Sequence, residues 1–116
     1  MTTDAKRPLT PAEFEVLIAL ADGEKHGYAI LKAVARDSDG PAVGPATLYT
    51  IIRRFLESGL IAESAHRPDA SLDDERRRYY RLTDAGRAAA RAEAERMESL
   101  LASARAKNLV RKPRRA

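Results

Sequence analysis

The sequence contains no cysteine, and this absence limits both its chemistry and its expected location. Without thiols, disulfide bonds and thiolate metal sites are excluded, and a reducing cytoplasm is the expected compartment. The longest apolar run, residues 16–21, is far shorter than the ~20 residues that span a bilayer, so no membrane association is expected. The first residues, MTTDAKRPL, hold no apolar core, and a signal peptide is therefore not expected.

Residue types that carry catalysis are also scarce. The two histidines, His26 and His66, lie far apart and share no metal-ligand spacing. The sequence has no phosphate-cradling glycine loop and no nucleophile elbow. We therefore predict that the protein is not an enzyme and that it needs no metal and no cofactor. His26, followed by Gly27, is expected to shape the start of a helix, and His66 is expected to belong to the wing of the fold described below.

Charge is unevenly distributed along the 116 residues. The last ten residues contain no acid and five cations, namely Lys107, Arg111, Lys112, Arg114 and Arg115. Subtracting these five charges from the net charge of +4 leaves −1 for the remainder, so any binding to a polyanion must depend on local patches. Residues 110–116 are expected to form a basic, disordered tail that either adds affinity for phosphates or serves as a solubilising end.

Helical periodicity is present in three successive segments. The sequence TPAE at residues 10–13 is a capping box with proline at the first helical position, and it predicts a helix over residues 11–21 with an apolar side at positions 14, 17, 18 and 21. A second helix is predicted over residues 26–37. A third is predicted over residues 45–57, with an apolar stripe at positions 48, 51, 52, 55 and 56. Gly59 fits a left-handed C-terminal cap, after which Leu60 and Ile61 return to the core.

Two short strands are predicted next, over residues 60–65 and 76–82, joined by the polar loop RPDASLDDE. Alternation in the second strand places Tyr80 and Leu82 in the core and Tyr79 in a partly exposed, hydrogen-bonding position. Three helices followed by a hairpin form a winged helix-turn-helix, so the predicted fold class is mainly α with a small β-hairpin. The winged domain is expected to span residues 9–83, after a flexible N-terminal arm of residues 1–8.

The third predicted helix has a polar face that suits DNA. Opposite its apolar stripe lie positions 46, 50, 53 and 57, and because the major groove is about as wide as a helix, Arg53 can reach guanine while flanking residues contact phosphates. The alternative is an ordinary solvated helix face. The arginines at 76–78 are expected near the tip of the wing, where they follow the phosphate backbone or neutralise the acids at 73–75. The predicted DNA-binding residues are Thr47, Tyr49, Thr50, Arg53, Arg54, Arg76, Arg77 and Arg78.

A long helix is predicted over residues 84–109, with Thr83 as its N-cap. Apolar residues along it form a heptad seam that so small a domain cannot cover, which predicts a two-fold homodimer that reads an inverted repeat in double-stranded DNA. The alternative is a helix that folds back only onto the first helix of its own chain. The predicted dimerisation residues are Ala90, Ala94, Met97, Leu100, Leu101 and Ala104.

Three stretches make the chain resemble the PadR family of transcriptional regulators: HGY at residues 26–28, GPATLYTIIRRFLESGLI at 44–61 and ERRRYYRLTDAG at 75–86. The likeness runs from about residue 9 to 109, and the C-terminal region is similar to the subgroup with a single dimerisation helix. It implies a homodimeric repressor with the third helix in the major groove, the wing near the minor groove and Tyr49 on the DNA backbone. Thr50 stands where the family often has proline, and Leu56 where it often has an acid, so operator specificity is not carried over.

Two questions stay open from the sequence. Some members of the family release DNA when a small aromatic compound binds between the subunits. Here no aromatic residue follows Tyr80, which argues against a large aromatic pocket between the long helices and leaves a small one near Phe14 or Tyr28. Winged helices also serve as protein-protein interaction modules. Such modules need no basic third helix, arginine-rich wing or basic tail, so DNA binding is favoured.

Overall fold

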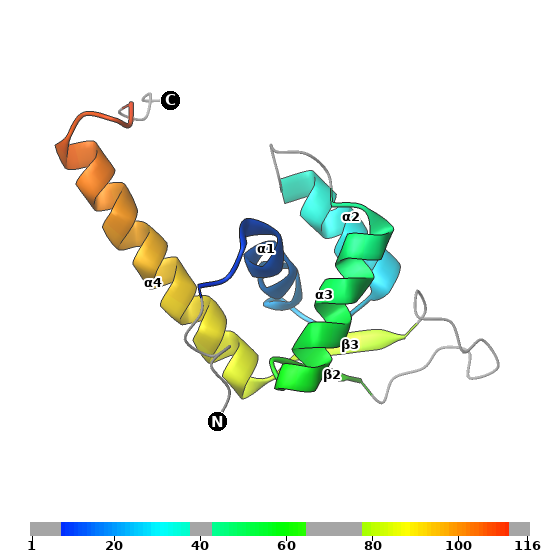
Figure 1. The fold of residues 1–116 in the computed structure, drawn as a ribbon. Helices are drawn as coiled ribbons and strands as arrows, with labels where there is room; N and C mark the ends of the chain where they lie inside the picture. Colours follow the sequence, from blue (N-terminus) through cyan, green and yellow to red (C-terminus); the bar gives the residue numbers. More distant parts are fainter. Residues whose placement is uncertain (1–7, 38–42, 65–77, 112–116) are drawn as a thin grey trace.

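The computed structural model describes residues 8–37, 43–64 and 78–111. In chain order these form α1 (Pro11–Leu20), β1 (Lys25–His26), α2 (Gly27–Asp37), α3 (Pro45–Ser58), β2 (Ile61–Glu63), β3 (Tyr79–Leu82) and α4 (Asp84–Ala106). This order confirms the predicted winged helix-turn-helix followed by a long helix (Figure 1). Several predictions lie outside the described residues: those for residues 1–7, for His66, for Arg76 and Arg77, and for the end of the tail.

The capping box at the start of α1 is formed as predicted. The backbone N–H of Glu13 donates to Thr10 Oγ1 at 3.1 Å, and the Thr10 N–H donates to Glu13 Oε1 at 2.9 Å. These two bonds satisfy backbone donors that the first turn of a helix otherwise leaves open. α1 therefore starts at Pro11, and its start is fixed by local sequence.

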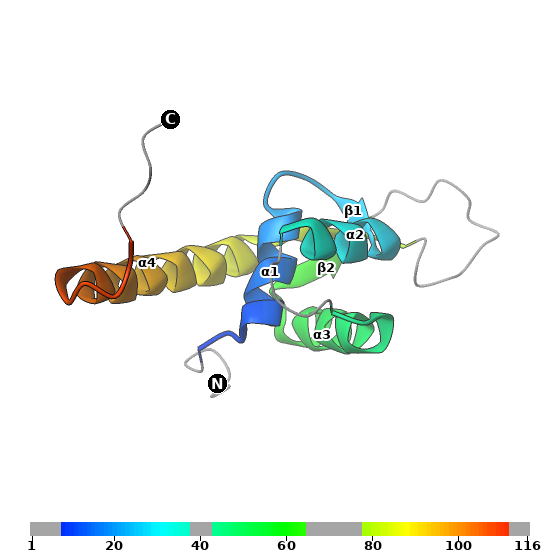
Figure 2. The ribbon, with the colours of Figure 1, turned by 90° about the horizontal axis from the view of Figure 1, so that it is seen from above.

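The buried side of α1 differs from the predicted one. Val16, Leu17 and Leu20 are buried, whereas Ile18 is 44% exposed and Phe14 is only partly buried. α1 packs against α2 and α3 on one side and against α4 on another, so its burial does not follow a single stripe. Figure 2 shows α1 between α4 and the other two helices. Of the four positions predicted on the apolar side, Leu17 is buried as expected; the prediction was wrong for Ile18 and Ala21, because it assumed one contact face.

Four of the five positions predicted for the stripe of α3 are buried, and the fifth, Leu56, is partly buried. Leu48, Ile51, Ile52 and Phe55 are each at most 6% exposed, and they join residues of α1 and α2 in one core. α3 ends at Gly59, whose φ of 82° lies in the left-handed region that glycine adopts without a steric penalty. The chain then turns back, and the Leu60 N–H donates to the Phe55 carbonyl at 3.0 Å.

The sheet has three strands, in the order β1-β3-β2, instead of the two that were predicted. β2 and β3 form the expected antiparallel pair, with Ile61 opposite Leu82, and Tyr80 is only 1% exposed in the core. β1 adds Lys25 opposite Tyr80 and His26 opposite Tyr79. Two residues are too few to give an alternating pattern, so this strand is defined only by its backbone pairing with β3.

The start of α4 is built around one backbone carbonyl. Thr83 is the N-cap, as predicted, and its Oγ1 accepts from the Gly86 N–H at 3.0 Å. The Thr83 N–H and hydroxyl also donate to the Leu60 carbonyl, at 3.1 and 2.9 Å. A Cβ on Gly86 would lie 1.9 Å from that same oxygen, so only glycine allows α4 to lie this close to the end of α3.

α4 runs past the body of the domain. Its first half contacts α1 and β3, and Arg87 donates to the Ala21 carbonyl at 3.2 Å. Its second half extends away from the other helices (Figures 1 and 2). α4 ends at Ala106, earlier than the predicted residue 109, because Asn108 has a φ of 60° and the Leu109 N–H donates back to the Ala104 carbonyl at 2.8 Å. This is the hydrogen-bond pattern of a Schellman cap.

Candidate nucleic-acid interface

α3 presents a polar face opposite its buried stripe. Ala46, Thr47, Thr50, Arg53 and Glu57 are all exposed, at the positions that the periodicity indicates. Consecutive helical residues are about 100° apart around the axis, so the two edges of this face point toward different neighbours. We call these two edges the shoulders of α3. Tyr49 and Arg53 lie toward one shoulder, and Thr47 and Arg54 lie toward the other.

Tyr49 lies against the first residue of α2. A Cβ on Gly27 would be 2.8 Å from both Cε1 and the hydroxyl oxygen of Tyr49, so the ring rests directly on this glycine. The ring is partly buried against the core. The glycine of the HGY stretch therefore makes room for the tyrosine of α3 and fixes where its hydroxyl lies.

His26 shapes the start of α2, as predicted. Its Nδ1 accepts a hydrogen bond from the Ala29 N–H at 3.1 Å, which is the geometry of an N-cap. Its ring also meets the edge of Tyr79 on β3, with centroids 5.4 Å apart and planes at 87°. His26 thereby joins the helix-turn-helix to the sheet, and Tyr79 is partly buried at this contact.

The hydroxyl of Thr50 bonds within its own helix, donating to the Ala46 carbonyl at 2.9 Å. Thr47 and Thr50 line one wall of a hollow of about 370 Å³. The other wall comes from the start of α1, with Thr10 and Glu13. The hollow therefore opens between α1 and the shoulder of α3 that is opposite Tyr49.

Arg54 occupies this second shoulder and is bonded to α1. Its Nη1 donates to Glu13 Oε2 at 3.1 Å, and the side chains of Arg54 and Glu13 are 48% and 4% exposed. The sequence showed Glu13 as the capping-box carboxylate but gave no sign that its second oxygen binds α3. The signal that points to this role is the burial of a charged residue, which only the structure supplies.

Arg78 directly precedes β3. Its Nε lies 3.9 Å from Glu63 Oε2 on β2, and both side chains are about a third exposed. Ile61 pairs with Leu82 at one end of the two strands, and Arg78 lies at the opposite end. Its predicted place toward the tip of the wing stays a prediction, because residues 65–77 lie outside the described residues. An ion pair of this length and exposure contributes little stability.

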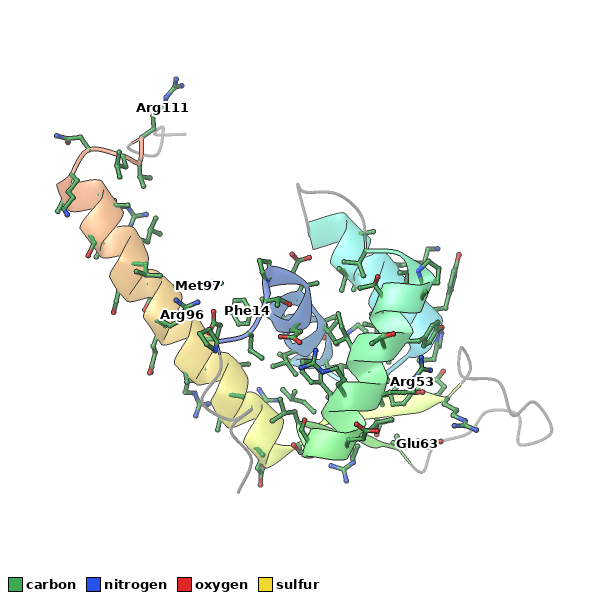
Figure 3. The ribbon with its side chains drawn as sticks, in the orientation of Figure 1. Phe14, Arg53, Glu63, Arg96, Met97 and Arg111 are labelled. Atoms are coloured by element: carbon green, nitrogen blue, oxygen red, sulfur yellow. The ribbon has the colours of Figure 1, made fainter. Side chains whose placement is uncertain are left out.

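α4 divides into a covered half and an open half. Of the predicted dimerisation residues, Ala90 packs on the core of its own chain and Met97 is partly buried. Phe14 projects from α1 toward the side of α4 that carries Arg96 and Met97 (Figure 3). Beyond Met97, Leu100 and Leu101 are 57% and 38% exposed and Ala104 is partly buried. Ala94, which precedes Met97, is exposed.

Glu93, a buried carboxylate of α4, bonds both to Arg96 on its own helix and to the backbone of Leu9 before α1. Arg96 donates to Glu93 through Nη2 at 2.5 Å and through Nε at 3.2 Å. The hydrogen bonds from Arg96 are the main reason that the pKa of Glu93 is below its usual range. A hydrogen bond from the Leu9 backbone N–H lowers the pKa further. The same bonds raise the pKa of Arg96.

Two classes of site are not found in the described part of the chain. Within residues 8–37, 43–64 and 78–111, no three His, Cys, Asp or Glu side chains come together in a way that could hold a metal ion. In these same ranges no helix has both the length and the apolar character to cross a membrane.

The family of the chain follows from comparison with known proteins. Residues 16–92 match the transcriptional regulator PadR-like family. The chain belongs to this family. The match runs from within α1 to within α4 and so includes α2, α3 and the three strands in full. PadR-like proteins are transcriptional regulators, which confirms that the chain is not an enzyme.

Two relatives have similar sequences. The transcriptional regulator Rv3488 of Mycobacterium tuberculosis is 34% identical over 85 residues, which cover 73% of this chain and 74% of that protein. An uncharacterised 37.1 kDa protein of transposon TN4556 from Streptomyces fradiae is 41% identical over 90 residues, which cover 77% of this chain. The PadR-like chain spans only 24% of the length of that second relative.

Solved structures show the same fold. A PadR family transcription regulator from Clostridium difficile R20291 has a TM-score of 0.69 at 20% identity, covering 83% of this chain and 96% of its own. BpsR of Bordetella bronchiseptica has a TM-score of 0.64 at 29% identity, covering 89% of this chain and 67% of its own. These likenesses support the winged-helix architecture of the PadR-like chain.

Proposed function

We propose that this PadR-like protein is a homodimeric transcriptional repressor that binds double-stranded DNA. The observation that carries the proposal is the division of α3 into a buried stripe and an exposed face with Thr47, Thr50 and Arg53. A helix with one free polar side fits the major groove of DNA, and its family is one of transcriptional regulators.

The exposed residues have distinct roles in this proposal. Arg53 reads a base, because a guanidinium can bond both acceptors of guanine in the major groove. Thr47 and the Tyr49 hydroxyl contact phosphates and set the position of α3, with Thr50 at the centre of the face. The wing, from Arg78 outward through Arg77 and Arg76, follows the backbone or a narrow minor groove.

Dimerisation uses the open half of α4. Leu100 and Leu101 are exposed apolar side chains on the part of the helix that extends beyond its own domain. A partner copy would bury them in a two-fold contact, with Ala94 and Ala104 allowing close approach of the helices. Two copies of α3 about one DNA turn apart, ~34 Å, would then read an inverted repeat.

Release by a small molecule is a further part of the proposal. BpsR, one of the structural neighbours, is described through the regulation of its DNA binding by 6-hydroxynicotinic acid. In the PadR-like chain, a small aromatic acid would bind near Phe14, which lies on the α4 side of α1. Adding 6-hydroxynicotinic acid should raise the melting temperature of the protein and lower its affinity for DNA; no change in either excludes this compound as the effector.

The test of DNA binding compares Arg53→Ala with the wild type by fluorescence anisotropy. The DNA is a duplex found by footprinting the region upstream of the gene, with a random duplex as reference. Loss of a base contact should weaken binding to the specific duplex by about 1–3 kcal/mol and reduce its preference over the random one. Equal losses on both duplexes would contradict base reading by Arg53.

Salt dependence separates DNA binding from the protein-protein alternative. The logarithm of the affinity for DNA should fall linearly with the logarithm of the salt concentration, because bound cations are released from phosphates. A domain that serves only to contact other proteins would show no measurable binding to duplex DNA and no such slope.

A further inference from the structure

Adjacent arginines on α3 lie in different surroundings. Arg53 is exposed on the shoulder that also carries Tyr49, whereas Arg54 lies on the shoulder next to α1. Both have the chemistry to bind a DNA phosphate. Their different positions raise the question of whether both act on DNA.

Arg54 is held by a buried carboxylate. Glu13 is 3% exposed, and its two oxygens are divided between two tasks: Oε1 accepts from the Thr10 N–H at 2.9 Å, and Oε2 accepts from Arg54 Nη1 at 3.1 Å. A buried carboxylate that loses its cation keeps an uncompensated charge out of water, which is strongly unfavourable. Moving Arg54 away from Glu13 and toward a phosphate therefore costs free energy.

The pair also lies where DNA would pass. Arg54 and Glu13 line the hollow together with Thr47 and Thr50, which are part of the exposed face of α3. Arg54 is 48% exposed, so its guanidinium could reach that surface if Glu13 released it. Because the negative charge of Glu13 offsets the positive charge of Arg54, this shoulder of α3 carries no net positive charge from the pair.

We propose that Glu13 neutralises Arg54 and keeps it from acting as a phosphate ligand. The inference rests on the proposed DNA-binding function. Phosphate contacts give affinity for any sequence, and only base contacts discriminate among sequences. Removing one cation from the phosphate-binding set therefore lowers the affinity for specific and random DNA alike, and it leaves base reading by Arg53 as the source of discrimination.

The experiment measures the salt slope on random duplex DNA for five proteins: wild type, Glu13→Gln, Arg54→Gln, the double variant and Arg53→Gln. Glutamine at position 13 retains the capping box, so α1 should still form. Glu13→Gln should steepen the slope by about 0.9 per protomer, which corresponds to a roughly three- to fourfold change in relative affinity between 50 and 200 mM salt. The double variant should return to the wild-type slope.

The two single-arginine variants are the matched pair. Arg54→Gln should leave the salt slope unchanged. The same substitution one position earlier, Arg53→Gln, should lower the slope. An equal fall in both would overturn the inference, because Arg54 would then be a phosphate ligand. An unchanged slope in a folded Glu13→Gln would also overturn it and leave the pair a purely structural link. Arg54→Gln leaves the buried Glu13 carboxylate without this cation, so circular dichroism checks that each single variant is folded. Where a single variant does not fold, the double variant decides, because a slope below that of the wild type would overturn the inference.

The outcome is separable from the proposed function. A wild-type protein with no salt-dependent binding to duplex DNA would contradict the proposed function itself. A wild-type protein that binds with a log-linear slope, together with an Arg54→Gln variant that lowers this slope, would contradict only the role of Glu13.

Discussion

At the residue scale, close backbone approach determines which side chains are allowed. The carbonyl oxygen of Leu60 accepts bonds from both the N–H and the hydroxyl of Thr83, and it also lies where a Cβ of residue 86 would be. The glycine of the LTDAG sequence is therefore required by a contact between the end of α3 and the start of α4. Helix propensity alone would favour almost any other residue there.

We predict that Gly86→Ala destabilises the protein by about 2–3 kcal/mol, although alanine is the better helix former. The added methyl group cannot be accommodated without moving backbone, since its nearest neighbour is a carbonyl oxygen at 1.9 Å. Urea unfolding followed by circular dichroism measures the change. Gly44→Ala is the matched control, because no atom lies within 4 Å of the Cβ position there, and it should cost less, on the order of 1 kcal/mol. Equal losses in both would contradict the steric explanation.

At the element scale, α1 is held on both sides by charged groups. Glu13 joins its first turn to Arg54 of α3, and Glu93 of α4 accepts a hydrogen bond from the Leu9 backbone just before it. The apolar pattern of α1 did not indicate either contact. The start of α1 thus lies between the predicted dimerisation helix and the predicted reading helix, which makes it the connection between them.

We predict that the Glu93–Arg96 pair stabilises the protein at neutral pH and that this contribution is lost in acid. The pKa of Glu93 is lowered in the folded state, chiefly by the hydrogen bond from Arg96, relative to a usual value of 4.5. The folded state therefore binds its proton less readily than the unfolded state does, so the contribution is complete above the usual pKa and falls as pH drops through the lower, folded one.

The measurement is the free energy of unfolding from pH 7 to pH 3 for wild type and Glu93→Gln. The wild type should be more stable at pH 7, and the difference should shrink below about pH 4.5. Glu95→Gln changes an exposed carboxylate on the same helix and should leave the pH profile close to that of the wild type. A difference between wild type and Glu93→Gln that is constant with pH would contradict the prediction.

At the scale of the whole molecule, α4 is longer than the body that it packs against. Its first half is covered by α1 and β3, while Leu100 and Leu101 stay exposed on the projecting half. The sequence offered two alternatives, a dimer seam or a helix folded on its own chain. In the structure, the first half of α4 packs on its own chain. We propose that the remainder of α4 forms the dimer seam.

We predict that Leu101→Lys yields monomers with weakened binding to the inverted repeat, because a lysine in a two-fold contact faces its own copy. Light scattering measures the oligomeric state, and anisotropy on the full inverted repeat and on a single half-site measures the loss of combined affinity. Ala102→Lys places the same charge on an adjacent exposed residue that is outside the predicted seam. It should remain dimeric. A Leu101→Lys variant that is still dimeric would remove Leu101 from the seam.

The sequence by itself determined the features that depend on neighbouring residues. The capping box of Thr10 and Glu13, the buried stripe of α3 and the left-handed cap at Gly59 all follow from short spacings, because helix geometry repeats every few residues. The polar face of α3, and with it the predicted contact residues Thr47, Thr50 and Arg53, followed from the same periodicity.

Only the tertiary structure decided the features that join distant parts of the chain. The strand β1 exists because its two residues pair with β3, and the place of Arg54 depends on a carboxylate 41 residues away. Likewise, Ile18 is exposed because α2, α3 and α4 cover other parts of α1, and their directions of approach depend on the packing of distant segments. Local periodicity fixes which face of a helix is apolar, but the partner of each charged group depends on how the helices pack together.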